Sequence, residues 1–175
     1  MLAHPRQSVV VILNPGRAYA DAPEGDAHGI SLALLEAGCR LFGVTPLAVG
    51  DGEPQAPAAG TLQVFERIPL DGLVPWKDPS FVERMAQDNL RFLYVAGAWL
   101  EEDVLVAALE GAGRGYDTRL LSDLSAARRE SERKPVFDRV GLHGMLVTTV
   151  RQTLLEWAVC LGDSGLMQEI RQLLK

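Results

Sequence analysis

Residues 92–127 read FLYVAGAWLEEDVLVAALEGAGRGYDTRLLSDLSAA, and this segment defines the topology of the chain. It begins with an apolar run that turns at Gly97, continues as an Ala- and Leu-rich stretch, stops at Gly115 and resumes as a second apolar run at Leu120. This order predicts a buried strand, a helix and a second buried strand, which together form a βαβ unit. In parallel sheets the turn after a strand lies at the carboxyl edge, beside the free N–H groups of a helix. We therefore expect any reactive side chain between Gly97 and Val104.

The remaining segments continue the alternation of strands and helices. The apolar run Ser8–Leu13 has no polar alternation, which is typical of a central strand buried on both faces. Because right-handed crossovers return each strand to the same sheet, the alternation predicts an α/β fold, with three α/β/α layers and a six-stranded, mostly parallel, Rossmann-like sheet. We expect a single domain over residues 1–175. Further strands are expected at 44–49, 61–66 and 145–149, and helices between Asp26 and Gly43, from a cap at Ser80, and at 136–143, 150–161 and 164–174.

Composition limits the partners. The formal net charge is −6 and the pI is near 5.1, which argues against nucleic acid, because phosphate binding needs clustered Lys and Arg. No run approaches the ~20 apolar residues that a membrane-spanning helix requires, so we expect no membrane partner and a cytoplasmic location. Cys39 and Cys160 both fall in helical patterns; neither is expected to be catalytic or to form part of a disulfide framework.

The segment 92–127 resembles the isochorismatase-like superfamily of cysteine hydrolases. That family shows a strand ending in Ala-Gly, a short turn, a nucleophilic Cys followed by Val, an Ala-rich helix, Arg-Gly-Tyr and a strand ending in Asp. The chain matches the pattern at Ala96-Gly97, at Val104 and at Arg114-Gly115-Tyr116, but Asp103 stands at the position of the cysteine. The resemblance covers most of the chain. It implies hydrolase chemistry, a homo-oligomer and a cis peptide bond at Ala98-Trp99.

Superfamily members generally use three side chains: an Asp that ends the first strand, a Lys before the helix that leads to the nucleophile strand, and the Cys. The corresponding catalytic candidates here are Asn14, Lys77 and Asp103. An amide at Asn14 cannot act as a general base, and Asp103 cannot form a thioester. Isochorismatases that cleave a vinyl ether also lack the Cys, but they need the acid that Asn14 replaces. Neither chemistry is carried over intact, which indicates a pseudoenzyme or a binding protein.

The resemblance also places candidate ligand-binding residues around the cleft: Trp99, Ala98, Trp76 and Tyr19. Each of the two tryptophans could instead fill the core. The nicotinamidase branch binds a metal through His residues in the loop after the second strand, but residues 50–60 contain only Asp51 and Glu53 as potential ligands and no His. We therefore expect no metal and no cofactor.

Two alternatives concern the acidic turn. Glu101, Glu102 and Asp103 could simply complement the N-terminal dipole of a helix. If Asp103 and Lys77 instead face one cleft, we predict an ion pair that holds both groups ionised and leaves Asp103 inert. The alternative is that desolvation raises the pKa of Asp103 and makes it a competent acid.

Three functions follow from these alternatives. The first is an isochorismatase-like homologue without cysteine-dependent amidase activity that binds a small metabolite. The second is an active hydrolase of a small carboxylated or amide substrate that uses Asp103 and Lys77. The third is a structural subunit of an oligomer. The loss of two of the three catalytic side chains favours the first and the third.

Overall fold

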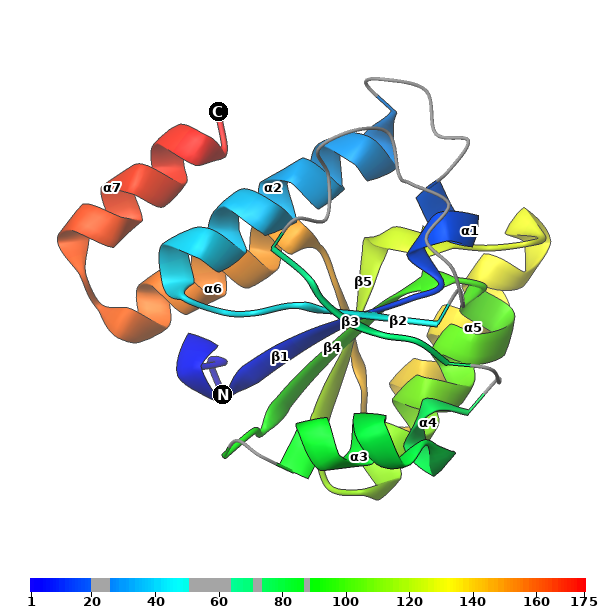
Figure 1. Cartoon of the computed structure of the whole chain (residues 1–175). Coiled ribbons are helices and arrows are strands. Elements are labelled where there is room, and N and C mark those ends of the chain that lie inside the picture. Colours follow the sequence, from blue (N-terminus) through cyan, green and yellow to red (C-terminus); the bar gives the residue numbers. More distant parts are fainter. Residues whose placement is uncertain (20–25, 51–63, 71–73, 87–88) are drawn as a thin grey trace.

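The computed structural model describes residues 1–19, 26–50, 64–70, 74–86 and 89–175. Within these residues six parallel strands form one sheet in the order β3-β2-β1-β4-β5-β6. The sheet runs through the middle of the molecule with helices on both sides (Figure 1). The α/β fold with three layers predicted from the sequence is confirmed. The strands are β1 (Ser8–Leu13), β2 (Leu47–Val49), β3 (Glu66–Ile68), β4 (Phe92–Ala98), β5 (Asp117–Ala126) and β6 (Leu146–Thr148).

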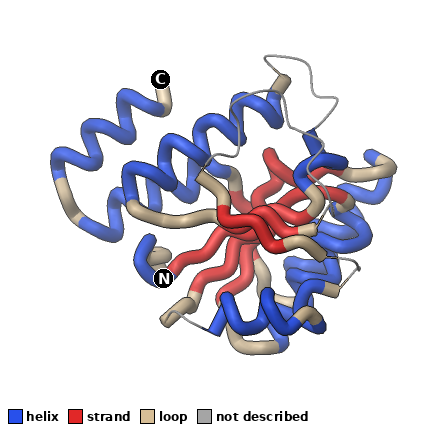
Figure 2. Tube along the Cα trace, viewed as in Figure 1, coloured by secondary structure: helices blue, strands red, loops and turns tan. Residues whose placement is uncertain are grey.

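The helices divide between the two faces of the sheet, as Figure 2 shows by their position around the strands. One face is covered by α2 (Ala27–Phe42), α6 (Val150–Leu161) and α7 (Ser164–Leu173), and the other by α3 (Pro79–Ala86), α4 (Leu105–Gly113) and α5 (Glu130–Leu142). The short helix α1 (Pro15–Tyr19) follows β1 directly. Three single turns complete the described elements: η1 (Pro5–Gln7), η2 (Pro75–Lys77) and η3 (Leu100–Val104). No helix in the described residues is long and apolar enough to cross a membrane.

Strand β1 lies at the centre of the sheet, between β2 and β4. Its side chains alternate between two separate apolar cores: Val10 and Ile12 pack under α2 and α6, whereas Val9 and Val11 pack on the opposite side. Both faces of the strand therefore need apolar residues, because each is covered by helices. This requirement explains the uninterrupted run of hydrophobic residues in the sequence.

Several predicted boundaries agree with the structure and others differ. Helix α2 has Asp26 at its N-cap and ends at Gly43, which adopts a left-handed conformation with φ of 66°. Helix α3, however, is capped by Asp78 rather than Ser80, because the Asp78 carboxylate accepts hydrogen bonds from the N–H groups of Ser80 and Phe81. Asp78 satisfies donors that would otherwise lack partners in the first turn.

The largest difference lies in α5. The sequence predicted a helix over 136–143, but α5 begins at Glu130. Its first turn is charged, with an Arg133–Glu130 ion pair, so it has no apolar periodicity for sequence analysis to detect. Strand β3 begins at Glu66, so the strand predicted over 61–66 overlaps it only at its end, and residues 61–63 lie outside the described part.

A charged cluster lies at the amino-terminal ends of the strands. Arg119 on β5 is buried and pairs with Asp117 and with Glu156 of α6. Its guanidinium also lies over the rings of Phe92 and Tyr94, at 5.2 Å and 5.7 Å from their centroids. A buried charge is tolerated only where it is paired and hydrogen-bonded, and this cluster meets that condition.

The carboxyl ends of β1 and β4 approach each other unusually closely. Gly97 has a φ of 114°, and a Cβ atom placed on it would lie 1.9 Å from the carbonyl oxygen of Leu13. Only glycine fits, because both the backbone angle and the space exclude a side chain. This contact holds Asn14 beside Ala98.

We predict that Gly97→Ala destabilises the protein by about 3 kcal/mol or more, because strained backbone and overpacking add. Urea unfolding followed by circular dichroism measures the loss. The matched control is Gly113→Ala at the end of α4, where an added Cβ meets nothing within 4 Å. The control is expected to be neutral or slightly stabilising; equal effects of the two changes would contradict the role given to Gly97.

Candidate functional site

Three predicted site residues meet at the carboxyl edge of the sheet. Asn14 follows β1, Ala98 ends β4, and Asp103 lies in the π-helical turn η3. The peptide bond between Ala98 and Trp99 is cis, as the family resemblance implied. Residues that are 84 and 89 positions apart in the sequence are thereby brought into hydrogen-bond contact.

Asn14 is the centre of this contact. It is buried and has a positive φ of 46°, a conformation that asparagine adopts more readily than most residues. Its Nδ2 group donates one hydrogen bond to the carbonyl oxygen of Ala98, at 2.8 Å, and a second to Oδ2 of Asp103, at 2.5 Å. Both amide protons are therefore used within the protein.

Asp103 is a buried carboxyl group with only 4% of its surface exposed. Its second oxygen, Oδ1, finds no hydrogen-bond partner among the described residues. Burial raises the pKa of Asp103, because desolvation disfavours the charged form, whereas the hydrogen bond from Asn14 and the positive charge of Arg17 act in the opposite direction. Desolvation is the strongest of these effects, so the carboxyl holds its proton more tightly than an exposed aspartate.

A small cavity lies against this pair. Its volume is about 10 Å³, close to the minimum that a single buried water occupies. Gly50, in the turn after β2, makes room for Asn14: its φ is 97°, and a Cβ atom there would lie 2.2 Å from Oδ1 of Asn14. The cavity is lined by Leu13, Asn14, Val49, Gly50, Leu70, Pro75 and Asp103.

Lys77 does not join Asn14 and Asp103. It ends the turn η2 and is exposed, and no ion pair connects it to Asp103 in the described part of the chain. Among the described residues, the charged groups that act on the Asp103 carboxyl are Arg17, Glu102 and Arg128. The predicted Lys77–Asp103 ion pair is therefore wrong, and the alternative in which desolvation raises the pKa of Asp103 agrees with the structure.

The two glutamates beside Asp103 do more than face a helix dipole. The Glu101 carboxylate accepts hydrogen bonds from the backbone N–H groups of Arg128 and Arg129, at 3.2 Å and 3.0 Å. Glu102 pairs with the Arg128 guanidinium at 3.0 Å, and this guanidinium also lies 5.1 Å from the ring centroid of Trp99. These contacts hold the segment after β5 over Trp99. The sequence did not predict them, because they join residues 26–28 positions apart.

Two predicted ligand-binding side chains have their polar atoms engaged inside the protein. Trp76 is buried, and its indole N–H donates to the carbonyl oxygen of Ala107 at 2.9 Å. The Tyr19 hydroxyl donates to the carbonyl oxygen of Leu124 at 2.6 Å, and burial raises its pKa well above the usual range. Any ligand contact of Trp76 or Tyr19 would therefore use their rings, and a binding role for either stays a prediction.

The cysteines lie away from this edge. Cys39 is in α2 and Cys160 in α6. Burial and the neighbouring Glu36 raise the pKa of the Cys39 thiol to about 12. A thiol with such a pKa is almost entirely protonated near neutral pH and is a poor nucleophile.

Within the described residues no group of three or more His, Cys, Asp or Glu side chains could hold a metal ion. Asp51 and Glu53, the potential ligands considered in the sequence, lie outside the described residues.

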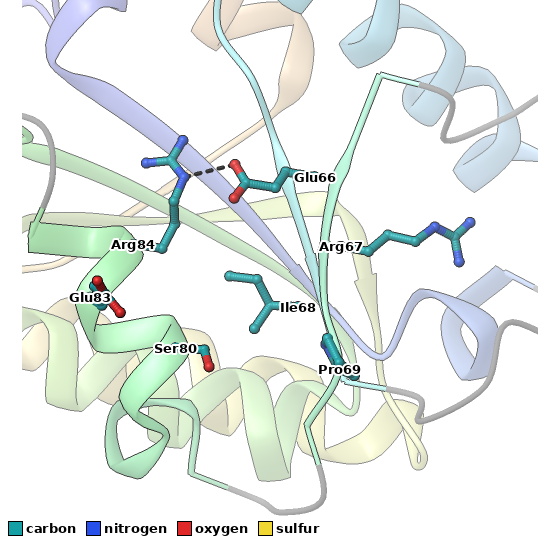
Figure 3. Close-up of a pocket in the computed structure, with 7 residues that line it drawn as sticks. All are labelled: Glu66, Arg67, Ile68, Pro69, Ser80, Glu83 and Arg84. Atoms are coloured by element: carbon teal, nitrogen blue, oxygen red, sulfur yellow. Dashed lines mark hydrogen bonds and ion pairs between the residues drawn. The ribbon is translucent and has the colours of Figure 1, made fainter.

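A second, wider hollow lies between β3 and α3 (Figure 3), with a volume of about 330 Å³. The Glu66 and Arg84 side chains point toward one another there and form an ion pair at 2.7 Å, whereas Arg67 points away. None of the predicted site residues lines it. The hollow is lined by Glu66, Arg67, Ile68, Pro69, Ser80, Glu83 and Arg84.

Sequence comparison relates the chain to isochorismatase domain-containing proteins. It is 22% identical over 158 residues to isochorismatase domain-containing protein 1 of Danio rerio. The aligned region covers 86% of this chain and 54% of that protein. The protein of the same name from Salmo salar is 22% identical over 139 residues, which covers 75% of this chain and 48% of the relative. The chain spans about half the length of these curated relatives. No protein-family model matches it.

Solved structures share the fold. The YcaC gene product of Escherichia coli, described as an octameric hydrolase of unknown specificity, superposes with a TM-score of 0.78 at 16% identity, over 97% of this chain and 89% of that one. A putative MAR1 ribonuclease from Leishmania donovani gives a TM-score of 0.79 at 15% identity, over 99% and 94% of the two chains. An isochorismatase-like hydrolase from Alkaliphilus metalliredigens gives 0.67 at 9% identity, over 87% and 97%. At such identities the likeness establishes the fold.

We predict that stability depends on pH through Asp103. Its pKa is raised in the folded protein above the unfolded value of about 3.9, so the carboxyl stabilises the fold fully below that value. The contribution is lost as pH rises through the folded-state pKa. Asp103→Asn removes the titration, so its stability relative to the wild type should improve from pH 4 to pH 8, as measured by urea unfolding.

Asp138→Asn, which changes an exposed carboxylate on α5, is the control and should keep the wild-type pH slope. A difference between wild type and Asp103→Asn that stays constant with pH would show that Asp103 titrates normally.

Proposed function

We propose that this chain, which resembles the isochorismatase-like hydrolases in sequence and fold, binds a small molecule and lacks cysteine-dependent amidase activity. The ligand binds at the carboxyl edge of the sheet, beside Asn14 and Asp103. The observation that carries the proposal is the hydrogen bond from Asn14 Nδ2 to Asp103 Oδ2.

This hydrogen bond replaces the acid–thiol contact of the cysteine hydrolases and reverses its direction. In the family pattern the residue after the first strand accepts a proton from the nucleophile. Here the Asn14 amide donates to the group at the nucleophile position, and an amide cannot take a proton from it near neutral pH. A carboxylate cannot supply the thioester intermediate either, so the two-step thiol mechanism has neither its base nor its nucleophile.

The site nevertheless keeps features that favour a ligand. Asp103 Oδ1 is buried without a partner in the described residues, and leaving a buried polar atom unsatisfied costs roughly 1–3 kcal/mol. Such costs concentrate at binding sites, where a bound group can satisfy the atom. The neighbouring Trp99 ring is partly exposed beneath Arg128 and offers an apolar surface for a ligand.

A second function is favoured by one observation. Because burial raises the pKa of Asp103, this carboxyl could act as a general acid or base in a hydrolase of a small carboxylated or amide substrate. Lys77, the charged anchor of that mechanism, is exposed rather than paired with Asp103. Ligand binding therefore remains the preferred function.

A homo-oligomer and a cytoplasmic location accompany the proposal. The octameric YcaC structure supports the oligomer, and exposed apolar residues at the edge strand β6, Leu146 and Val147, offer surface for association. If association were the whole function, the chain would be a structural subunit without a ligand.

Parallel assays separate the three functions. The purified protein is screened for hydrolysis of small amides and of isochorismate, and the same compounds are tested for thermal stabilisation. Stabilisation without turnover is the expected result. Turnover that Asp103→Asn abolishes while the fold is kept would favour the acid–base hydrolase, and neither turnover nor stabilisation would favour the structural subunit.

We further predict that restoring the family pair restores thiol reactivity. In the double variant Asn14→Asp/Asp103→Cys, the carboxylate at position 14 can accept the thiol proton at position 103, so acrylamide should alkylate that position at least tenfold faster than any cysteine of the wild type. Peptide mass spectrometry locates the adduct.

The single variant Asp103→Cys, which retains Asn14, is the matched control and should react more slowly than the double variant. The wild type should show no adduct at Cys39. Rapid alkylation of Cys39 or Cys160 in the wild type, accompanied by loss of an amidase activity, would contradict the proposal.

A further inference from the structure

The orientation of the Asn14 amide is fixed by its neighbours. The carbonyl oxygen of Ala98 can only accept a hydrogen bond, so the NH₂ group of Asn14 rather than its oxygen must face it. The same NH₂ group supplies the hydrogen bond to Asp103. A flipped amide would place its oxygen against the carbonyl oxygen of Ala98, so this contact decides the assignment.

This orientation makes the two oxygens of Asp103 inequivalent. Oδ2 accepts from Asn14 in either protonation state, and in a neutral carboxyl group the carbonyl oxygen is the better acceptor. Oδ1 has no partner among the described residues. The proton of a neutral Asp103 therefore resides on Oδ1, and the ionised form presents Oδ1 as a free acceptor.

We propose that Asn14 is a positioning residue that keeps Oδ1 of Asp103 available to one small hydrogen-bonding group in the adjacent cavity. In the free protein this group is a water molecule, and in a complex it is a hydroxyl or amino group that ends a ligand. The size of the cavity, about 10 Å³, admits one heavy atom and excludes a carboxylate or a phosphate. The remaining lining is mostly apolar, with Leu13, Val49 and Leu70.

In the described part of the chain, three charged groups act on the Asp103 carboxyl. Arg17 faces it from α1 and Arg128 from the segment after β5, and both favour the ionised form, whereas Glu102 of η3 favours the neutral form. The other described residues that line the cavity do not titrate: Leu13, Val49, Gly50, Leu70 and Pro75. Within the described residues, the protonation of Asp103 thus depends on burial, on Asn14 and on these three charges.

The inference extends the proposed function and rests on it only for the ligand that replaces the water. The experiments below use the free protein, so the two can fail separately. Amidase activity in the wild type would overturn the proposed function, whereas an Oδ1 without a bound water would overturn this inference.

The first experiment is a crystal structure of the wild type near 1.5 Å resolution, grown at pH 8. We expect one water within hydrogen-bond distance of Asp103 Oδ1. Asp103→Asn should retain this water, because Asn14 would engage the new carbonyl oxygen and turn the new NH₂ group toward the cavity. Asp103→Leu, of similar volume but apolar, should lose it. A wild-type site without water, or a water kept equally by Asp103→Leu, would refute the proposal.

The second experiment follows the Asp103 carboxyl carbon by ¹³C NMR across pH. A midpoint above the ordinary value of about 3.9 is expected. Asn14→Leu removes the donor at nearly constant volume and should raise the midpoint by a further 1–2 units, roughly the 1.5–3 kcal/mol of a hydrogen bond to a charged group.

Arg17→Gln should also raise the midpoint but leave the water in place. This variant separates the effect of a nearby charge from the positioning of the carboxyl by Asn14. A wild-type midpoint at or below the ordinary value would overturn the inference even if Asn14→Leu does not fold.

Discussion

The close approach of β4 to β1 is the constraint on which the site depends. Gly97 lies against the backbone of Leu13 with no room for a Cβ atom, and the paired register Leu13–Gly97 is the last rung between the two strands. The next residues, Asn14 and Ala98, are consequently held within hydrogen-bond distance. The turn η3 starts from this point, so the position of Asp103 follows from the packing of two central strands and not from the surface loops.

At positions 14 and 103 the hydrogen-bond donor and acceptor are exchanged relative to the family pattern. A strand-end acid facing a thiol is a proton acceptor facing a proton donor. Asn14 facing Asp103 is the reverse, a fixed donor facing an acceptor. In this chain one hydrogen bond joins the two positions, so both buried side chains have a partner. One of the changes alone would be costly: Asp at position 14 would oppose Asp103, and like charges at this distance force one group to hold a proton.

The fold was largely predictable because its signals are periodic or compositional. The run Ser8–Leu13 is apolar and ends at a turn sequence, and the βαβ unit at 92–127 is long, apolar and divided by Gly97 and Gly115; the structure confirms both. The start of helix α5 was predicted too late in the sequence, since its first turn is charged and shows no apolar periodicity. The sequence also predicted Asn14 and Asp103 at one edge, because parallel strands bring their carboxyl ends together.

The position of Lys77 could not be predicted in the same way. It lies in a proline-bounded turn outside any strand, where no periodic rule fixes the direction of a side chain. The contacts of Glu101 and Glu102 with the segment at Arg128 were missed for a related reason: they join loops whose proximity depends on the finished sheet. Sequence rules thus locate groups at strand ends better than the groups that approach them from loops.

The protonation of Asp103 follows from a comparison of opposing effects. A hydrogen bond to a charged group contributes about 1.5–3 kcal/mol, and the single donor Asn14 supplies one such bond. Removing a carboxylate from water costs several kcal/mol even after relaxation. One donor cannot offset that cost, and Arg17 is exposed, so water screens its charge. The pKa is therefore raised in spite of a favourable partner. A thiolate at the same position would be desolvated in the same way and would depend still more on a neighbouring base, which Asn14 cannot provide. With Asn14 in place of the acid after β1, we therefore expect thiol chemistry at this edge to be slow even when position 103 is a cysteine.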